Sequence, residues 1–125
     1  MESQVTNQHV GAGPCKCMDP QCGLDYFHSR QIGTDHPFGL VALRTCKLCS
    51  INWLHYQVEH EVFTGSSRWF RGIVEPGTHI QADTAGALLG KMPWHFYGGS
   101  YFKTAGARGT GSVKAVVQPY IPASF

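Results

Sequence analysis

Two close-spaced groups of cysteines constrain this chain more than any other feature of its sequence. The downstream group is the C-x-x-C pair Cys46 and Cys49, and the upstream group has the spacing C-x-C-x4-C over Cys15, Cys17 and Cys22. Two thiols on one tight turn can share a metal ion, and zinc takes four ligands in a tetrahedron. The two groups therefore predict one site that joins the N-terminal region to the middle of the chain.

The spacing favours one ligand set and leaves others open. The set that we expect is Cys17, Cys22, Cys46 and Cys49, with Cys15 as the alternate. Gly23 directly follows Cys22 and suits a turn whose backbone amides face a thiolate. Cys15 with Cys17 or with Cys22 as the upstream pair, all three upstream cysteines with one of the downstream pair, and His28 or His36 in place of a cysteine are alternatives. A closed four-cysteine site leaves no position for water, which predicts a structural Zn²⁺, with an iron–sulfur cluster as the rival.

The upstream spacing also carries a resemblance. C-x-C-x4-C resembles the three-cysteine half-site that follows the catalytic domain in SET methyltransferases. The resemblance covers eight residues, and no other part of the chain resembles that class of enzyme. It implies a zinc half-site and nothing more.

The N-terminal residues bear on the compartment and hence on the chemistry of the thiols. Residues 1–10 are polar and contain no apolar core of a signal peptide. No run approaches the roughly 18 apolar residues of a membrane span. We therefore expect a cytoplasmic, reducing location, where clustered cysteines are more often metal ligands than disulfides.

Composition indicates a small folded domain. The chain has 125 residues, 42% of them apolar, which predicts a single globular domain rather than a disordered chain. Its 15 glycines and 7 prolines indicate many turns and argue against a helical bundle. The net charge of +2 is too small to imply nucleic-acid binding by itself.

The clearest periodicity lies in residues 51–63 and predicts a half-buried strand. Leu54, Tyr56 and Val58 fall on one face, while Trp53 and His55 fall on the other. Alternation with period two and enrichment in aromatic and β-branched residues are typical of strands. We expect the first face to serve the core. Trp53 is then either covered by another element or available to a partner.

The remaining elements complete an α+β domain. The expected strands are 39–45, 51–63, 68–74 and 113–117; the expected helix is 79–91; the expected loops are 24–38, 64–67 and 104–112. Thr78 and Gln81 have the spacing of a capping box, and Pro93 ends the helix. Residues 94–103 read as a hairpin with a Gly-Gly turn or as one bulged strand.

Together these elements predict a small zinc-stabilised α+β domain, an antiparallel sheet built on a central hairpin with one main helix. The expected organisation is a loose arm at 1–14, a zinc-binding region at 15–49, and the hairpin, helix and C-terminal strands at 50–125.

The functional prediction rests on the absence of catalytic motifs and on the aromatic residues of the chain. It contains no nucleophile elbow, phosphate-binding glycine motif or H-E-x-x-H sequence, so we expect no enzymatic activity and no catalytic residues. Large aromatic and arginine side chains are the usual anchors of protein interfaces. The candidate partner-binding residues are Trp53, His55, Arg68, Trp69, Arg71 and Trp94.

Two functions follow. The segments CKLCSINWLHY, SSRWFRG and WHFYGGSYF loosely resemble small bacterial proteins, some of them immunity-type inhibitors of toxins. The resemblance implies a zinc-binding protein that acts through protein–protein contact. The alternative is a zinc-ribbon protein that binds nucleic acid through Arg68, Arg71, Lys103, Arg108 and Lys114.

Overall fold

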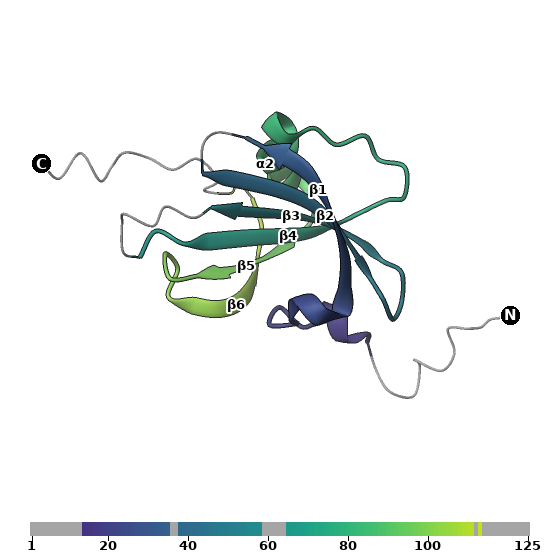
Figure 1. Ribbon diagram of the computed structural model, residues 1–125. Helices are drawn as coiled ribbons and strands as arrows, with labels where there is room; N and C mark the ends of the chain where they lie inside the picture. The colour runs from purple at the N-terminus through teal and green to yellow at the C-terminus, as the bar shows by residue number, and fades with distance from the viewer. Residues whose placement is uncertain (1–13, 36–37, 59–64, 112, 114–125) are drawn as a thin grey trace, which may run out of the picture.

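A six-stranded antiparallel sheet forms the centre of the fold (Figure 1). The computed structural model describes residues 14–35, 38–58, 65–111 and 113. The strands follow one another in chain order as β1 (Phe27–Thr34), β2 (Gly39–Cys46), β3 (Asn52–Val58), β4 (Arg68–Val74), β5 (His95–Gly99) and β6 (Thr104–Gly109). The other elements are the short helix α2 (Ala85–Lys91) and the 3₁₀ segments η1 (Lys16–Met18), η2 (Leu24–Tyr26) and η3 (Ala82–Thr84). The predicted combination of an antiparallel sheet with a single helix is confirmed at this level for the described residues.

Strands β3 and β4 lie in the middle of the sheet. They pair antiparallel along their full lengths, with Asn52 opposite Val74 and Val58 opposite Arg68. The residues between them, 59–64, lie outside the described part of the chain, so the predicted central hairpin stays a prediction. The predicted arm at 1–14, apart from Pro14, and the predicted strand at 113–117, apart from Val113, lie outside it as well.

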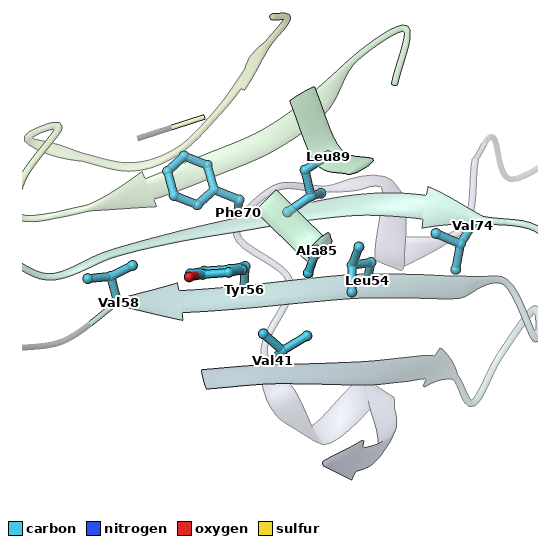
Figure 2. Close-up of a cluster of buried hydrophobic side chains, with 8 residues drawn as sticks. All are labelled: Val41, Leu54, Tyr56, Val58, Phe70, Val74, Ala85 and Leu89. Atoms are coloured by element: carbon cyan, nitrogen blue, oxygen red, sulfur yellow. The ribbon is translucent and has the colours of Figure 1, made fainter. Parts of the chain in front are cut away.

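One face of the sheet packs against α2. Leu54, Tyr56 and Val58 point to this face, as their alternation predicts, and all three are fully buried. Figure 2 shows the cluster gathered between strands β2 to β4 and the helix, and its members are Val41, Leu54, Tyr56, Val58, Phe70, Val74, Ala85 and Leu89. Apolar burial of this kind is the main favourable term in folding. This cluster is the larger of two cores.

Gly72 allows the helix end to approach β4 closely. A Cβ atom at this position would lie 2.1 Å from the Met92 sulfur and 3.0 Å from a methyl carbon of Leu89. The residue after the helix therefore packs directly on the strand backbone.

The opposite face of the sheet also contains a buried core. Its core contains Cys17, Phe27, Cys46, Trp53 and Phe96. Trp53 has no exposed surface, because the N-terminal cysteine segment, Trp94 and Phe96 cover it. Of the two alternatives for Trp53, the structure therefore shows the covered one.

Two strands lie where loops were expected, and both are edges of the sheet. Strand β1 occupies 27–34, and most of its residues are exposed, so it has no apolar alternation to detect. Its pairing with β2 shifts register between Gln31 and Gly33, which breaks the period further. Strand β6 occupies 104–109, where glycines and alanines pair through the backbone and present little apolar surface.

The helix is shorter than predicted. Its regular part begins at Ala85, after a 3₁₀ turn, rather than near residue 79. The predicted capping box does not form, because the Thr78 hydroxyl donates to the Glu75 carbonyl at 2.6 Å and Gln81 is extended. Of the two alternatives for 94–103, the bulged strand is the one observed, because β5 contains both glycines and its pairing with β6 shifts register between Tyr97 and Gly99. The turn to β6 follows at 100–103. Within the described residues, no helix is long and apolar enough to cross a membrane.

Candidate metal centre

Four cysteine sulfurs meet where the N-terminal segment crosses the end of β2. They belong to Cys15, Cys17, Cys46 and Cys49, and all four lie within 4.8 Å of one another. The Cys15 and Cys46 sulfurs are 3.6 Å apart, and the Cys17 and Cys49 sulfurs are 3.5 Å apart. A tetrahedral zinc site with Zn–S bonds of about 2.3 Å has sulfurs separated by about 3.8 Å. All five cysteines are free of disulfides, so these four thiols fit a bound metal ion.

Two tight turns position the ligands. Cys46 is the last residue of β2. The chain then turns back, and the turn is closed by the Ser50 amide, which donates to the Cys46 carbonyl at 2.9 Å. Ser50 has a φ of 69°, a left-handed conformation that lets the turn close. On the other side, Cys15 precedes the 3₁₀ turn η1, in which the Met18 amide donates to its carbonyl at 2.9 Å. This turn places Cys15 and Cys17 at the same site.

The surroundings of Cys46 favour its thiolate. Burial opposes ionisation, but hydrogen bonds from the backbone amides of Cys49 and Leu48 lower the pKa of Cys46 to about 7. The Leu48 amide lies 3.3 Å from the sulfur. Amides that converge on a sulfur in this way are suited to a metal-bound thiolate.

Cys17 and Cys49 ionise less readily than Cys46. Burial raises the pKa of Cys17, and burial also raises the pKa of Cys49 to about 11. Several thiolates packed together repel one another, whereas a cation among them favours their deprotonated forms. The Trp53 indole acts in the same direction by lowering the pKa of Cys17, and its buried Nε1 has no other hydrogen-bond partner in the described residues.

Arg71 on β4 connects the N-terminal cysteine segment to the sheet through hydrogen bonds. Its Nη2 donates to the carbonyl oxygens of Cys17 and Asp19, at 3.1 Å each. The guanidinium lies over the ring of Trp53, 4.5 Å from its centroid, and only 2% of the residue is exposed. A cation thus sits beside the thiols that a metal would hold as thiolates.

The ligand group differs from the predicted set at one position, because Cys15 takes the place of Cys22. The carboxylate of Asp19 accepts a hydrogen bond from the Gln21 amide, and the Cys22 amide donates to the Asp19 carbonyl. This turn carries Cys22 away from the four sulfurs and toward the Gly23 carbonyl, 3.8 Å away. Of the two histidine alternatives, His28 is exposed on β1 outside the group, and His36 lies outside the described residues.

Most of the predicted partner-binding residues are buried. Trp53, His55, Arg68 and Arg71 are each no more than 6% exposed, which corrects the expectation that they form an open surface. The N-terminal segment covers three of them, and Arg68 lies over the Tyr101 ring and donates to the Ser66 carbonyl. The remaining two, Trp69 and Trp94, are half-buried.

No family model, curated protein or solved structure matches this chain. The chemistry of the site must therefore be argued from its own residues.

Sequence reasoning missed Arg44, which proves to be part of the second face. It lies on β2 opposite Trp53, half-buried, and burial together with the charge of Arg71 lowers its pKa to about 10. The available signal was a single arginine within the short apolar strand GLVALRT. A charged residue that points inward from such a strand is a candidate for binding.

Proposed function

We propose that this chain is a Zn²⁺-stabilised protein that acts by binding a protein partner rather than by catalysis. The observation that carries the metal assignment is the group of four cysteine sulfurs within 4.8 Å of one another. Four thiolates are a usual structural zinc set and leave no open position for a substrate or water. The metal would fix the segment that covers Trp53 to the turn at the end of β2.

Exposed apolar side chains on the loops beside the metal support a protein partner. Leu24 is 59% exposed on η2, and Leu48 is 51% exposed between the two downstream cysteines. The Lys47 amide donates to the Tyr26 carbonyl at 2.8 Å, so the two loops meet. We propose that these loops, 23–26 and 46–49, form the partner surface in place of the buried aromatic residues. An immunity-type inhibitor of a toxin is one form of such a protein.

The nucleic-acid alternative has less support. Arg68 and Arg71 are buried, so they are not free to contact phosphates along a strand. Lys103 and Arg108 are exposed near β6, and Lys114 lies outside the described residues. Among the described members of the predicted set, these two exposed cations make a small footprint for a charge-driven interaction.

The metal is tested by elemental analysis of protein purified without added metal. We expect about one zinc per chain and a lower melting temperature after a strong chelator has removed it, because zinc binding contributes to folding. The larger core beside α2 does not contain the cysteines, so the loss should be partial. Protein that is free of metal and melts at an unchanged temperature with or without added zinc would contradict the assignment.

The partner is tested by capture from native lysate after nuclease treatment. The zinc-loaded protein should retain one protein partner, and the Leu24→Asp, Leu48→Asp double variant should lose it while still folding. Leu40→Asp is the matched control, because Leu40 is 43% exposed on β2 and lies outside the two loops. Capture that disappears with nuclease, or that falls steeply with salt, would indicate the nucleic-acid role instead.

A further inference from the structure

A cavity of about 250 Å³ lies between the second face of the sheet and the N-terminal segment. Its floor comes from three neighbouring strands, with Arg44 on β2, His55 on β3 and Arg71 on β4. Its rim includes Cys22 on the segment that follows η1, together with Ala105 on β6. The volume is below the roughly 300–1,000 Å³ of typical ligand pockets, so the cavity suits a small ligand.

Two arginines line the cavity from one face of the sheet. His55 and Arg71 lie opposite each other in the β3–β4 pairing, and Arg44 is on the same face one strand away. Burial lowers the pKa of Arg71, while the nearby thiols of Cys22 and Cys17 and the Asp19 carboxylate favour its charged form.

Several polar atoms around the cavity have no partner. The Nε atoms of Arg44 and Arg71 and the Nδ1 atom of His55 are buried without a hydrogen bond in the described part of the chain. Arg71 is 2% exposed and His55 is 6% exposed, so water from outside the fold does not satisfy them freely. A buried polar group without a partner costs about 1–3 kcal/mol, which makes three around one cavity a strong indication of a ligand.

His55 also limits which ligand can bind in the cavity. The His55 Nε2 lies 3.3 Å from the Gln57 side-chain oxygen, an arrangement that suits the tautomer with the proton on Nε2. Burial and the charge of Arg44 lower the pKa of His55 to about 3, so the ring is neutral. In this tautomer Nδ1, which has no partner among the described residues, is an acceptor and fits a ligand that brings a proton of its own.

We propose that this cavity binds inorganic phosphate as its hydrogen phosphate dianion. The guanidinium groups of Arg44 and Arg71 would bind the charged oxygens, and the Nδ1 of His55 would accept the hydrogen of the P–OH group. A carboxylate is planar and is satisfied by one bidentate arginine, whereas groups on three adjacent strands suit a tetrahedral oxyanion. Sulfate has the same shape and charge but carries no hydrogen at neutral pH.

The proposal is tested by isothermal titration of the zinc-loaded full chain with sodium phosphate, at fixed ionic strength in a phosphate-free buffer. We expect saturable binding of one phosphate per chain, and affinity for sulfate and acetate at least about tenfold weaker. Sulfate binding as tight as phosphate binding would overturn the role of the P–OH hydrogen, and the proposal with it. Absence of any saturable phosphate binding would also overturn it.

Three variants locate the site. Arg44→Gln should weaken phosphate binding by about tenfold or more, the loss expected for a charged hydrogen bond. His55→Phe keeps a ring that can stack on Trp69, whose centroid lies 6.2 Å away, and should remove the preference for phosphate over sulfate. Arg30→Gln is the control, because it removes the same charge from exposed β1 and should leave affinity within about twofold.

Circular dichroism and zinc content show whether each variant keeps its fold. Arg71 is left unchanged because its contacts with Cys17 and Asp19 make misfolding a separate cause of lost binding. Folded Arg44→Gln protein that binds phosphate like the wild type would contradict the assignment. The tests of the metal and of the protein partner use other residues. The proposed function can therefore fail while phosphate binding is confirmed, and phosphate binding can fail while the proposed function is confirmed.

Discussion

Replacement of Trp53 by alanine should destabilise the protein severely rather than remove a contact with a partner. Trp53 has no exposed surface and stacks on Phe96 with ring centroids 5.6 Å apart. Its ring also lies under the Arg71 guanidinium and beside Trp94, at centroid distances of 4.5 and 6.2 Å. The substitution would therefore open a cavity between the sheet and the metal-binding segment.

The magnitude follows from the buried surface. A tryptophan buries roughly 150–250 Å² of surface, which at about 25 cal/mol per Å² corresponds to about 4–6 kcal/mol. Measured costs of replacing a buried Trp or Phe by Ala are about 3–5 kcal/mol. We therefore expect a loss of about 4 kcal/mol, a large share of the roughly 5–15 kcal/mol that stabilises a domain. The melting temperature should fall by roughly 10–25 °C.

Urea unfolding of the zinc-loaded proteins, followed by circular dichroism, measures this loss. Trp94→Ala is the matched control, because Trp94 is half-buried in the same cluster and should cost no more than about 2 kcal/mol. A Trp53→Ala protein that unfolds within about 1 kcal/mol of the wild type would refute the covered position of this ring. So would equal losses in the two variants.

Two further predictions concern the backbone and pH. Gly99→Ala should destabilise the protein by more than about 3 kcal/mol in urea unfolding, because φ is +117° and a Cβ would lie 2.5 Å from the Ser67 carbonyl oxygen. Gly77→Ala, also at positive φ but with no atom within 4 Å, should cost about 1 kcal/mol, and equal costs would contradict the close approach. His55 has a pKa near 3 when folded and about 6.5 when unfolded, so the unfolded state binds more protons between these values and stability falls as pH decreases through that window. His55→Gln should reduce the slope of unfolding free energy against pH by up to about 1.4 kcal/mol per pH unit. The control is His28→Gln, because His28 is exposed. A slope for His55→Gln that equals that of the control and the wild type would contradict the prediction.

The central strands could be predicted because their sequence pattern repeats the geometry of a strand. Leu54, Tyr56 and Val58 alternate with polar residues, and the face that they form is buried as expected. The other face could not be predicted from the same pattern. Its cover comes from a segment more than thirty residues away in sequence, brought there by the cysteines, as in the contact between Cys17 and Cys49.

The edges of the sheet escaped prediction for a physical reason. An edge strand needs backbone pairing on only one side and no buried side chains, so β1 and β6 have no hydrophobic periodicity. The register shift at Gly33 and the glycines of β6 suggest loops when only the sequence is considered.

The cysteines illustrate the limit of spacing arguments. The pair Cys46 and Cys49 meets in the group as expected, because a C-x-x-C turn brings its own two sulfurs together. Which upstream cysteines join them depends on the path of the backbone. The 3₁₀ turn at η1 directs Cys15 and Cys17 to one point, and the turn at Asp19 directs Cys22 elsewhere.

The most direct test of the metal centre compares the zinc content of Cys15→Ser and Cys22→Ser proteins, purified side by side without added metal. Both changes remove one thiol from the same short segment, but only Cys15 belongs to the four clustered sulfurs. The structure predicts that Cys22→Ser retains about one zinc per chain and that Cys15→Ser loses it or binds it at least about tenfold more weakly. Zinc retained by Cys15→Ser and lost by Cys22→Ser would contradict the ligand set described here.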